Sequence, residues 1–268
     1  MSQLDKRLSM ADMVARIAPG ESIALGGGGL QRKPIAAVKA LATSSLTDIP
    51  LIAFLGGPDV DILIGLGKVG RLSFGFVGFD AWGLAPNFRK AREGGTLEIV
   101  EYSEATMIAA FEAGAKRLPF IPTRFGLGTQ IMQTRTSPFR EFDCPISGER
   151  LVAVPAINPD VAIIHVNEAD HAGNAVIHSD CYCDPLIVRA AKRVFVTAER
   201  VVERLPADQT RRSTFLSRMW VHGVVEAPRG AGLSIMYPEY ALDLPRVLEY
   251  QKRATDPAWL DSFVAEAA

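Results

Sequence analysis

Apolar residues along this chain alternate between short continuous runs and helical spacings. The continuous runs are typical of strands that are covered on both faces of a sheet. Such strands are predicted at Ser22–Gly26, Ile49–Leu55, Arg71–Val77, Leu97–Glu101, Leu151–Val154, Val161–Val166 and Arg193–Thr197. Helices are predicted at Met10–Ala18, Pro34–Leu41, Val60–Leu66, Pro86–Glu93, Glu104–Lys116, Asp184–Ala191, Ala241–Arg253 and Pro257–Ala267. This alternation predicts an α/β fold with an open, doubly wound, mainly parallel sheet flanked by helices.

One stretch, residues 118–150, interrupts this rhythm and is rich in Pro, Gly, Thr and Arg. Long irregular segments inside a compact domain are usually functional loops or interface arms. The chain shows no internal repeat, low-complexity sequence or clear linker. We therefore expect a single domain over residues 1–268, with an irregular interface or active-site segment at about 118–150.

A run of four glycines follows the first predicted strand: Gly26, Gly27, Gly28 and Gly29. Backbone without side chains lets a ligand reach amide N–H groups, and Pro34 suits the first turn of the next helix. Such a turn favours an anion, or a carbonyl oxygen that becomes one. Neither a Walker loop nor the dinucleotide fingerprint fits the spacing. The alternative is a tight turn that only packs helix on strand.

Composition and charge exclude several classes of protein. Hydrophobic residues make up 48% and charged residues 22% of the 268 residues, which is ordinary for a globular protein, and the net charge of -1 favours neither nucleic acid nor an anionic membrane surface. The first residues carry charges where a signal peptide has an apolar core, and no apolar run is long enough to cross a bilayer. The sequence thus predicts a cytoplasmic protein without nucleic-acid or membrane partners.

Histidines and cysteines gather between residues 165 and 183, which invites a metal assignment. Zinc requires four converging ligands, and the Cys-x-Cys spacing of Cys181 and Cys183 is shorter than the usual gap. His165 lies inside an apolar strand, where a hydrogen-bonded core histidine is expected. We therefore expect no metal site.

Four segments align in order with one known family. They are the glycine run, GGPD (Gly56–Asp59), PDVAIIHVNEADHAGNA (Pro159–Ala175) and AAKRVFVTAERVVE (Ala190–Glu203). Together they resemble the α subunit of a family I coenzyme A transferase, and the resemblance runs from about residue 10 to 228. It implies a doubly wound α/β fold, a homologous β subunit in a heterodimer or α2β2 complex, and an active site at their interface. Coenzyme A would enter as part of the substrate, with no permanently bound cofactor.

Further motifs point to one branch of this family. GFVGFD (Gly75–Asp80), RLPFIPTRFGLG (Arg117–Gly128) and VVEAPRGA (Val224–Ala231) look similar to the α subunit of bacterial CoA-thioester hydrolases that open the last ring of steroid-derived substrates. That likeness implies hydrolytic ring opening in steroid degradation, a branch of lipid catabolism. Two alternatives stay open. One is a true CoA transferase with its catalytic glutamate on the β subunit, and the other is a non-catalytic scaffold subunit.

The resemblance also suggests site residues. Ordinary members carry the catalytic glutamate of the β subunit in a Ser-Glu-Asn-Gly-like turn, and Ser103-Glu104 resembles that turn here. Glu104 would act as nucleophile or general base, and Ser103 would contact substrate. Arg124 would hold a substrate carboxylate, and Lys33 would meet CoA phosphates or a second carboxylate. The plain alternatives are a helix cap at Ser103, a first-turn acid at Glu104, an ion pair at Arg124 and a solvated charge at Lys33.

Overall fold

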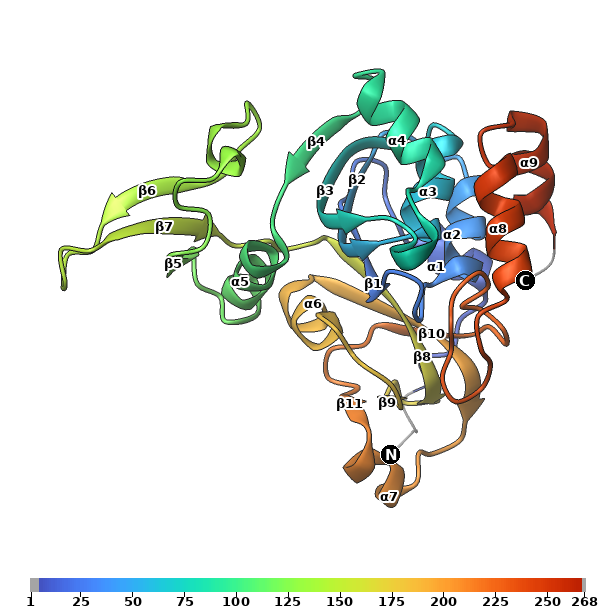
Figure 1. Cartoon of the computed structure of the whole chain (residues 1–268). Coiled ribbons are helices and arrows are strands. Elements are labelled where there is room, and N and C mark those ends of the chain that lie inside the picture. The colour runs from blue at the N-terminus through green and yellow to red at the C-terminus, as the bar shows by residue number, and fades with distance from the viewer. Residues whose placement is uncertain (1–4, 267–268) are drawn as a thin grey trace.

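A computed structural model describes residues 5–266, and its central feature is a mainly parallel sheet (Figure 1). Across the sheet the strands are β12 (Gly223–Glu226), β10 (Arg193–Val202), β8 (Val161–Asp170), β1 (Ile23–Gly28), β2 (Ile49–Gly56), β3 (Val69–Val77) and β4 (Glu98–Glu101). Two short antiparallel strands, β9 (Ala175–Ile177) and β11 (Thr214–Leu216), extend it beside the carboxyl half of β8. The doubly wound, mainly parallel fold predicted from the sequence is confirmed.

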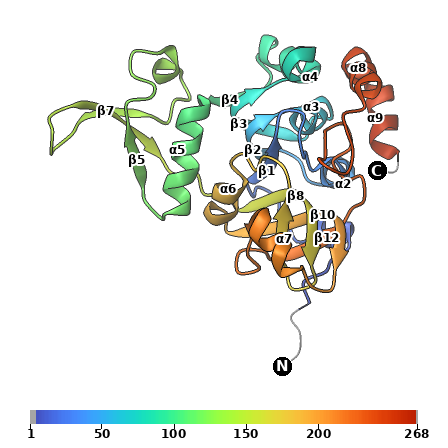
Figure 2. The same ribbon diagram turned by 60° about the horizontal axis from the view of Figure 1, so that its bottom comes forward.

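Helices cover both faces of this sheet (Figures 1 and 2). One face carries α1 (Met10–Ala15), α2 (Ile35–Thr43), α3 (Pro58–Gly65), α4 (Pro86–Glu93), α8 (Leu244–Arg253) and α9 (Pro257–Ala265), and the other carries α5 (Glu104–Ala115) and α6 (Asp184–Ala190). Because strand side chains alternate between the two faces, Ile23 and Leu25 of β1 lie in one core while Ala24 lies in the other. Within residues 5–266, none of the helices is long and apolar enough to cross a bilayer.

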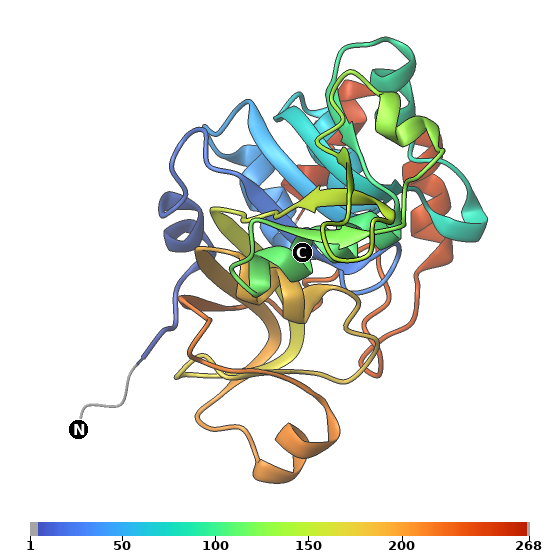
Figure 3. The same cartoon turned by 90° about the vertical axis from the view of Figure 1, so that its left-hand side faces the viewer.

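A second, three-stranded antiparallel sheet projects from the body beside α5 (Figures 1 and 2), and Figure 3 shows it in front of the body. We call residues 120–155 the arm. It contains β5 (Phe120–Thr123), η2 (Gln130–Gln133), β6 (Arg140–Asp143) and β7 (Arg150–Pro155), with β7 in the centre. Val152 and Val154 of β7 are fully buried against the α5 side of the body. The stretch predicted to be irregular therefore contains regular strands, of which β5 and β6 are only four residues long.

The two longest strands, β8 and β10, run further than their sequence pattern predicts. They pair with each other from Val161 and Arg193 to Asp170 and Val202. The apolar run of β8 stops at Val166, but the polar residues that follow it are buried as well. These strand ends leave the sheet close to α7 (Ala207–Arg212) and the β8–β9 turn.

Candidate active site

The order in which strands are added to the sheet reverses between β1 and β8. From β1 it adds β2, β3 and β4 on one side, and it then returns to add β8, β10 and β12 on the other. In open α/β sheets, ligands bind at the carboxyl ends of the strands at such a switch point. The glycine segment, residues 26–29, lies at the carboxyl end of β1 and therefore at this position.

All four residues of the glycine segment are buried, and most of their amides are already engaged. The N–H of Gly27 donates to Asp184 Oδ1 at 2.9 Å, that of Gly28 donates to the Gln31 carbonyl at 3.0 Å, and that of Gly29 donates to the Leu55 carbonyl at 3.0 Å. These three groups are not free to bind an oxyanion in this conformation. This differs from the expectation that the segment presents its amides to a ligand.

The glycines are required here because other groups approach their backbone closely. A Cβ on Gly28 would lie 2.7 Å from carbons of the Tyr182 ring, and one on Gly29 would lie 2.7 Å from Asp80 Oδ2. Gly27 and Gly29 also have positive φ values of 72° and 53°, which favour glycine. The segment thus brings an aromatic ring and a carboxylate against one stretch of bare backbone.

Lys33, predicted to bind substrate, lies beneath the glycine segment instead. Its side chain is fully buried, its Nζ is 3.0 Å from Asp59 Oδ2, and it donates to the Gly26 carbonyl at 3.3 Å. An enclosed ammonium cannot meet CoA phosphates without leaving its partner unpaired. In this conformation Lys33 therefore supports the turn from inside, and its contact with substrate stays a prediction.

A second buried ion pair ties the glycine segment to the start of α6. Arg32 Nη1 donates to Asp184 Oδ2 at 2.8 Å, and both side chains are fully buried. The same aspartate accepts the Gly27 amide with its other oxygen. Asp184 thus fixes the segment 182–184 against the end of β1.

Glu104 is the first residue of α5, and its side chain is exposed. Ser103 is the N-cap: its hydroxyl accepts the Thr106 amide at 3.2 Å, while Thr106 Oγ1 accepts the Ser103 amide at 2.9 Å. The capping alternative for Ser103 is thus present. The turn also holds the Glu104 carboxylate at a helix N-terminus, where the dipole favours negative charge.

Glu104 lies beside β3, and the helix that it begins, α5, packs against α6. A Cβ on Gly75 of β3 would lie 3.6 Å from the Cα of Glu104. Burial, with smaller contributions from Asp184, Cys181 and the Glu104 carboxylate, raises the pKa of the Cys183 thiol to about 12. Cys183 is also the N-cap of α6, which packs against α5, and Tyr182, the residue before it, lies on the glycine segment.

Arg124 lies on the arm rather than against the glycine segment. Its guanidinium makes a two-point contact with Glu149, in which Nη2 donates to Oε2 at 2.9 Å. The Arg124 side chain is 75% exposed, so the pair is open to solvent. The structure thus shows the ion pair that the sequence left open as the alternative role.

The histidines and cysteines between residues 165 and 183 do not converge. Among the described residues, 5–266, no group of three or more His, Cys, Asp or Glu side chains is arranged to hold a metal ion. His165 is fully buried, with Nδ1 2.9 Å from Thr197 Oγ1 and Nε2 2.9 Å from Glu199 Oε1. It is the hydrogen-bonded core histidine that its apolar strand predicts.

The sequence missed two side chains that border the glycine segment, Tyr182 and Asp80. Asp80 ends the GFVGFD motif, which was noted for its family likeness and not for chemistry. Both residues have positive φ, 47° and 51°, which is uncommon for residues other than glycine and concentrates at functional sites. The sequence carries no direct signal for this conformation.

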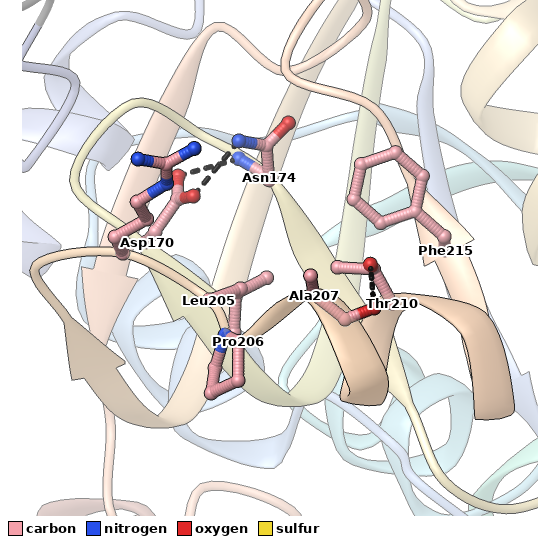
Figure 4. A pocket seen from close by; sticks show the side chains of 8 residues that line it. Asp170, Asn174, Leu205, Pro206, Ala207, Thr210 and Phe215 are labelled. Atoms are coloured by element: carbon pink, nitrogen blue, oxygen red, sulfur yellow. Dashed lines mark hydrogen bonds between the residues drawn. The ribbon is translucent and has the colours of Figure 1, made fainter.

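A pocket of about 460 Å³ opens elsewhere, between the β8–β9 turn and α7 (Figure 4). Its lining residues are Asp170, Asn174, Arg204, Leu205, Pro206, Ala207, Thr210 and Phe215. Asn174 already binds the Asp170 carboxylate: its backbone N–H donates to Oδ1 at 2.9 Å and its side-chain Nδ2 donates to Oδ2 at 2.8 Å. The pocket contains none of the predicted site residues, so the chemistry is better sought at the glycine segment and Glu104.

Comparison with known proteins agrees with the fold and the motifs. The sequence profile of the family described as "Coenzyme A transferase" matches residues 7–227. The chain is 39% identical, over 99% of its own length and 92% of the relative, to the "Cholesterol ring-cleaving hydrolase IpdA subunit" of Rhodococcus jostii (strain RHA1).

Two solved structures are similar over nearly the whole chain. Glutaconate coenzyme A-transferase from Acidaminococcus fermentans matches with a TM-score of 0.87 and 31% identity, covering 96% of this chain and 87% of that one. A variant of the decarboxylase AibA/AibB matches with a TM-score of 0.87 and 29% identity, covering 98% and 100%. One fold therefore carries CoA transfer, ring cleavage and decarboxylation among these relatives.

Proposed function

The chain belongs to the coenzyme A transferase family, and we propose that it is the α subunit of a two-subunit enzyme that opens a ring of a CoA thioester by hydrolysis. The substrate class, a steroid-derived acid, follows the ring-cleaving relatives from Rhodococcus jostii and Mycobacterium tuberculosis. The partner is a homologous β subunit, since one relative is named as a single subunit of glutaconate CoA-transferase and another belongs to the two-component AibA/AibB.

Glu104 is the observation that carries the proposal. An exposed carboxylate begins α5 next to β3, and α5 packs against α6, whose first residue, Asp184, accepts a hydrogen bond from the glycine segment. In a subunit that only completed its partner's site, no such carboxylate would be needed at this turn. Its placement at the carboxyl end of β4, beside Gly75 of β3, suits a group that works on a bound carbonyl.

As a general base, Glu104 takes a proton from water while the water oxygen bonds to a ring carbonyl carbon. The carbonyl electron pair moves to its oxygen, and the resulting alkoxide collapses by breaking the adjacent ring carbon–carbon bond. The electron pair of that bond is stabilised by the neighbouring thioester, and the ring carbon then takes the proton from Glu104. One water is consumed, and the product carries a new carboxylic acid and an intact CoA thioester.

Arg124 would hold a carboxylate of the substrate from the arm. Its guanidinium already holds a carboxylate in two-point geometry and is largely exposed, so a substrate carboxylate could exchange with Glu149. Ser103 would act through the turn that it caps rather than through a free hydroxyl.

A true CoA transferase is the second candidate, favoured by the 31% identity to the matching chain of glutaconate CoA-transferase from Acidaminococcus fermentans. In that case the thioester is attacked by a glutamate on the β subunit, which releases CoA thiolate and forms a mixed anhydride that the thiolate re-attacks. Glu104 would then be a first-turn acid without a chemical role.

The test is Glu104→Gln in the complex with the β subunit. We expect turnover of a cyclic oxo-acyl-CoA thioester to fall by ~10²–10⁴ because the base is lost while the shape is kept. Glu112→Gln, on the same helix and paired with Lys116, is the matched control and should keep its activity. Near-wild-type turnover in Glu104→Gln would exclude the hydrolase proposal and favour the transferase or a scaffold. Hydroxylamine trapping separates base from nucleophile, since it captures only a covalent glutamyl thioester.

A further inference from the structure

Addition to a carbonyl group creates a negative oxygen, and an enzyme stabilises that oxygen with hydrogen-bond donors that are already in place. The glycine segment was expected to supply them. Three of its amides, those of Gly27, Gly28 and Gly29, donate to acceptors of this chain instead. A neighbouring side chain is therefore the better candidate for the donor.

Tyr182 is a neighbouring group that lies directly against the bare backbone. Its ring packs on Gly28: a Cβ added to this glycine would lie 2.7–2.8 Å from three ring carbons, Cδ1, Cε1 and Cζ. Its own amide donates to Asp180 Oδ1 at 2.9 Å, and its φ of 47° is left-handed. A tyrosine costs free energy in this region, so the surrounding contacts hold it there.

The Tyr182 hydroxyl is free to act as a donor. Across residues 5–266 it makes no hydrogen bond, and it is not among the enclosed polar atoms without partners. Burial of the half-buried ring raises the pKa of Tyr182, with the carboxylates of Asp180 and Asp80 adding to the effect and Arg32 opposing it. The hydroxyl therefore keeps its proton at neutral pH and can donate it in a hydrogen bond.

We propose that the hydroxyl of Tyr182, whose ring lies on Gly28 directly before the N-cap of α6, is a catalytic hydrogen-bond donor to the carbonyl oxygen of the bound substrate. The inference rests on the proposed function. As water adds to the carbonyl carbon and its proton passes to Glu104, the oxygen becomes negative and the O–H bond of Tyr182 points to it. No proton leaves Tyr182, and the hydrogen bond weakens again when the alkoxide collapses to a carboxylic acid.

Arg32 lies over the Tyr182 ring. Its Cζ lies 5.9 Å from the centre of the Tyr182 ring, and its Nε donates to the Asp180 carbonyl at 3.0 Å. The same guanidinium is held by Asp184, so the ring, the turn at Asp180 and the glycine segment form one connected unit. This pre-organisation lets a single hydroxyl act without a reorganisation cost.

The experiment uses Tyr182→Phe in the complex with the β subunit. Its probe is oxocyclohexanecarboxyl-CoA, whose ring ketone lies next to the carbon bearing the thioester. The phenylalanine ring keeps the packing on Gly28 and removes only the hydroxyl. We expect kcat to fall by ~10²–10³ with KM within a few-fold of wild type, as for the loss of one oxyanion donor. Tyr237→Phe, on an exposed tyrosine, is the matched control and should be unchanged.

The outcomes separate the inference from the proposed function. If Glu104→Gln loses turnover and Tyr182→Phe keeps it within about threefold, the inference is overturned and the function stands. If Glu104→Gln keeps turnover, the proposed function fails on its own, and a wild-type complex that opens no ring overturns both. A Tyr182→Phe variant that loses kcat together with its thermal unfolding midpoint would show a structural role and also overturn the inference.

Discussion

Replacing Gly28 with alanine moves the Tyr182 ring without removing any ionisable group. The added Cβ would lie 2.7 Å from the ring carbons, and ordinary contact begins at about 3.4 Å, so the ring must shift by about 0.7 Å. A misplacement of ~1 Å can cost ~10²-fold in rate, so we expect kcat to fall by about 10- to 100-fold. Overpacking of a buried site should cost ~1–3 kcal/mol of stability.

The assay is steady-state turnover of the two-subunit complex, with unfolding followed separately by thermal denaturation. Gly67→Ala is the control, since its φ of 65° strains an alanine while no atom lies within 4 Å of the added Cβ. It should lose comparable stability, ~1–2 kcal/mol, and keep its activity. Because both changes act through one hydroxyl, Gly28→Ala combined with Tyr182→Phe should be no slower than Tyr182→Phe alone. Full additivity, or a fully active Gly28→Ala, would refute the reasoning.

Two further predictions concern buried charges on the α2–α3 side of the sheet. Lys33→Met leaves Asp59 charged and unpaired, so we expect a loss of ~3–5 kcal/mol of stability in denaturant unfolding, largely recovered when Asp59→Asn is added; no loss would contradict the buried pair. Burial raises the pKa of Asp61 from 3.8 to about 6, against hydrogen bonds that lower it. The folded state therefore holds this proton more tightly than the unfolded state. The stability that Asp61 contributes is fully present below about pH 3.8 and is lost as the pH rises through about 6. The unfolding midpoint of wild type relative to Asp61→Asn should fall over that range, and a constant difference would exclude the shift.

The periodicity of the sequence was sufficient for the parallel sheet because its strands are covered on both faces and read as apolar runs. It failed at β5, where Pro122 lies inside a four-residue strand of the arm. Such a strand depends on its partner: β7 pairs with it and buries Val152 and Val154 against the α5 side. That the chain forms a single domain stays a prediction.

The candidate site was predictable only in part. The turn at Glu104 has a local sequence signature, an N-cap residue followed by an acid. The glycine segment can likewise be recognised directly in the sequence. The burial of Lys33 could not be read from the sequence, because it depends on Asp59 from the next helix and not on neighbours in the chain. Tyr182 was missed for a similar reason, since Gly28 meets it only after the two halves of the sheet join.

The Asp184 carboxylate has a consequence for how the molecule assembles. It bonds to Gly27 across 157 positions and to Arg32 across 152, so neither contact forms while the chain is only half synthesised. Contacts of such long sequence separation form slowly, because the intervening chain must first give up its freedom. The glycine segment is thus among the last parts of the protein to reach its final geometry. A nascent or partly unfolded chain can form β1 to β4 and still have no working site. The protein is therefore able to bind substrate only when folding is complete.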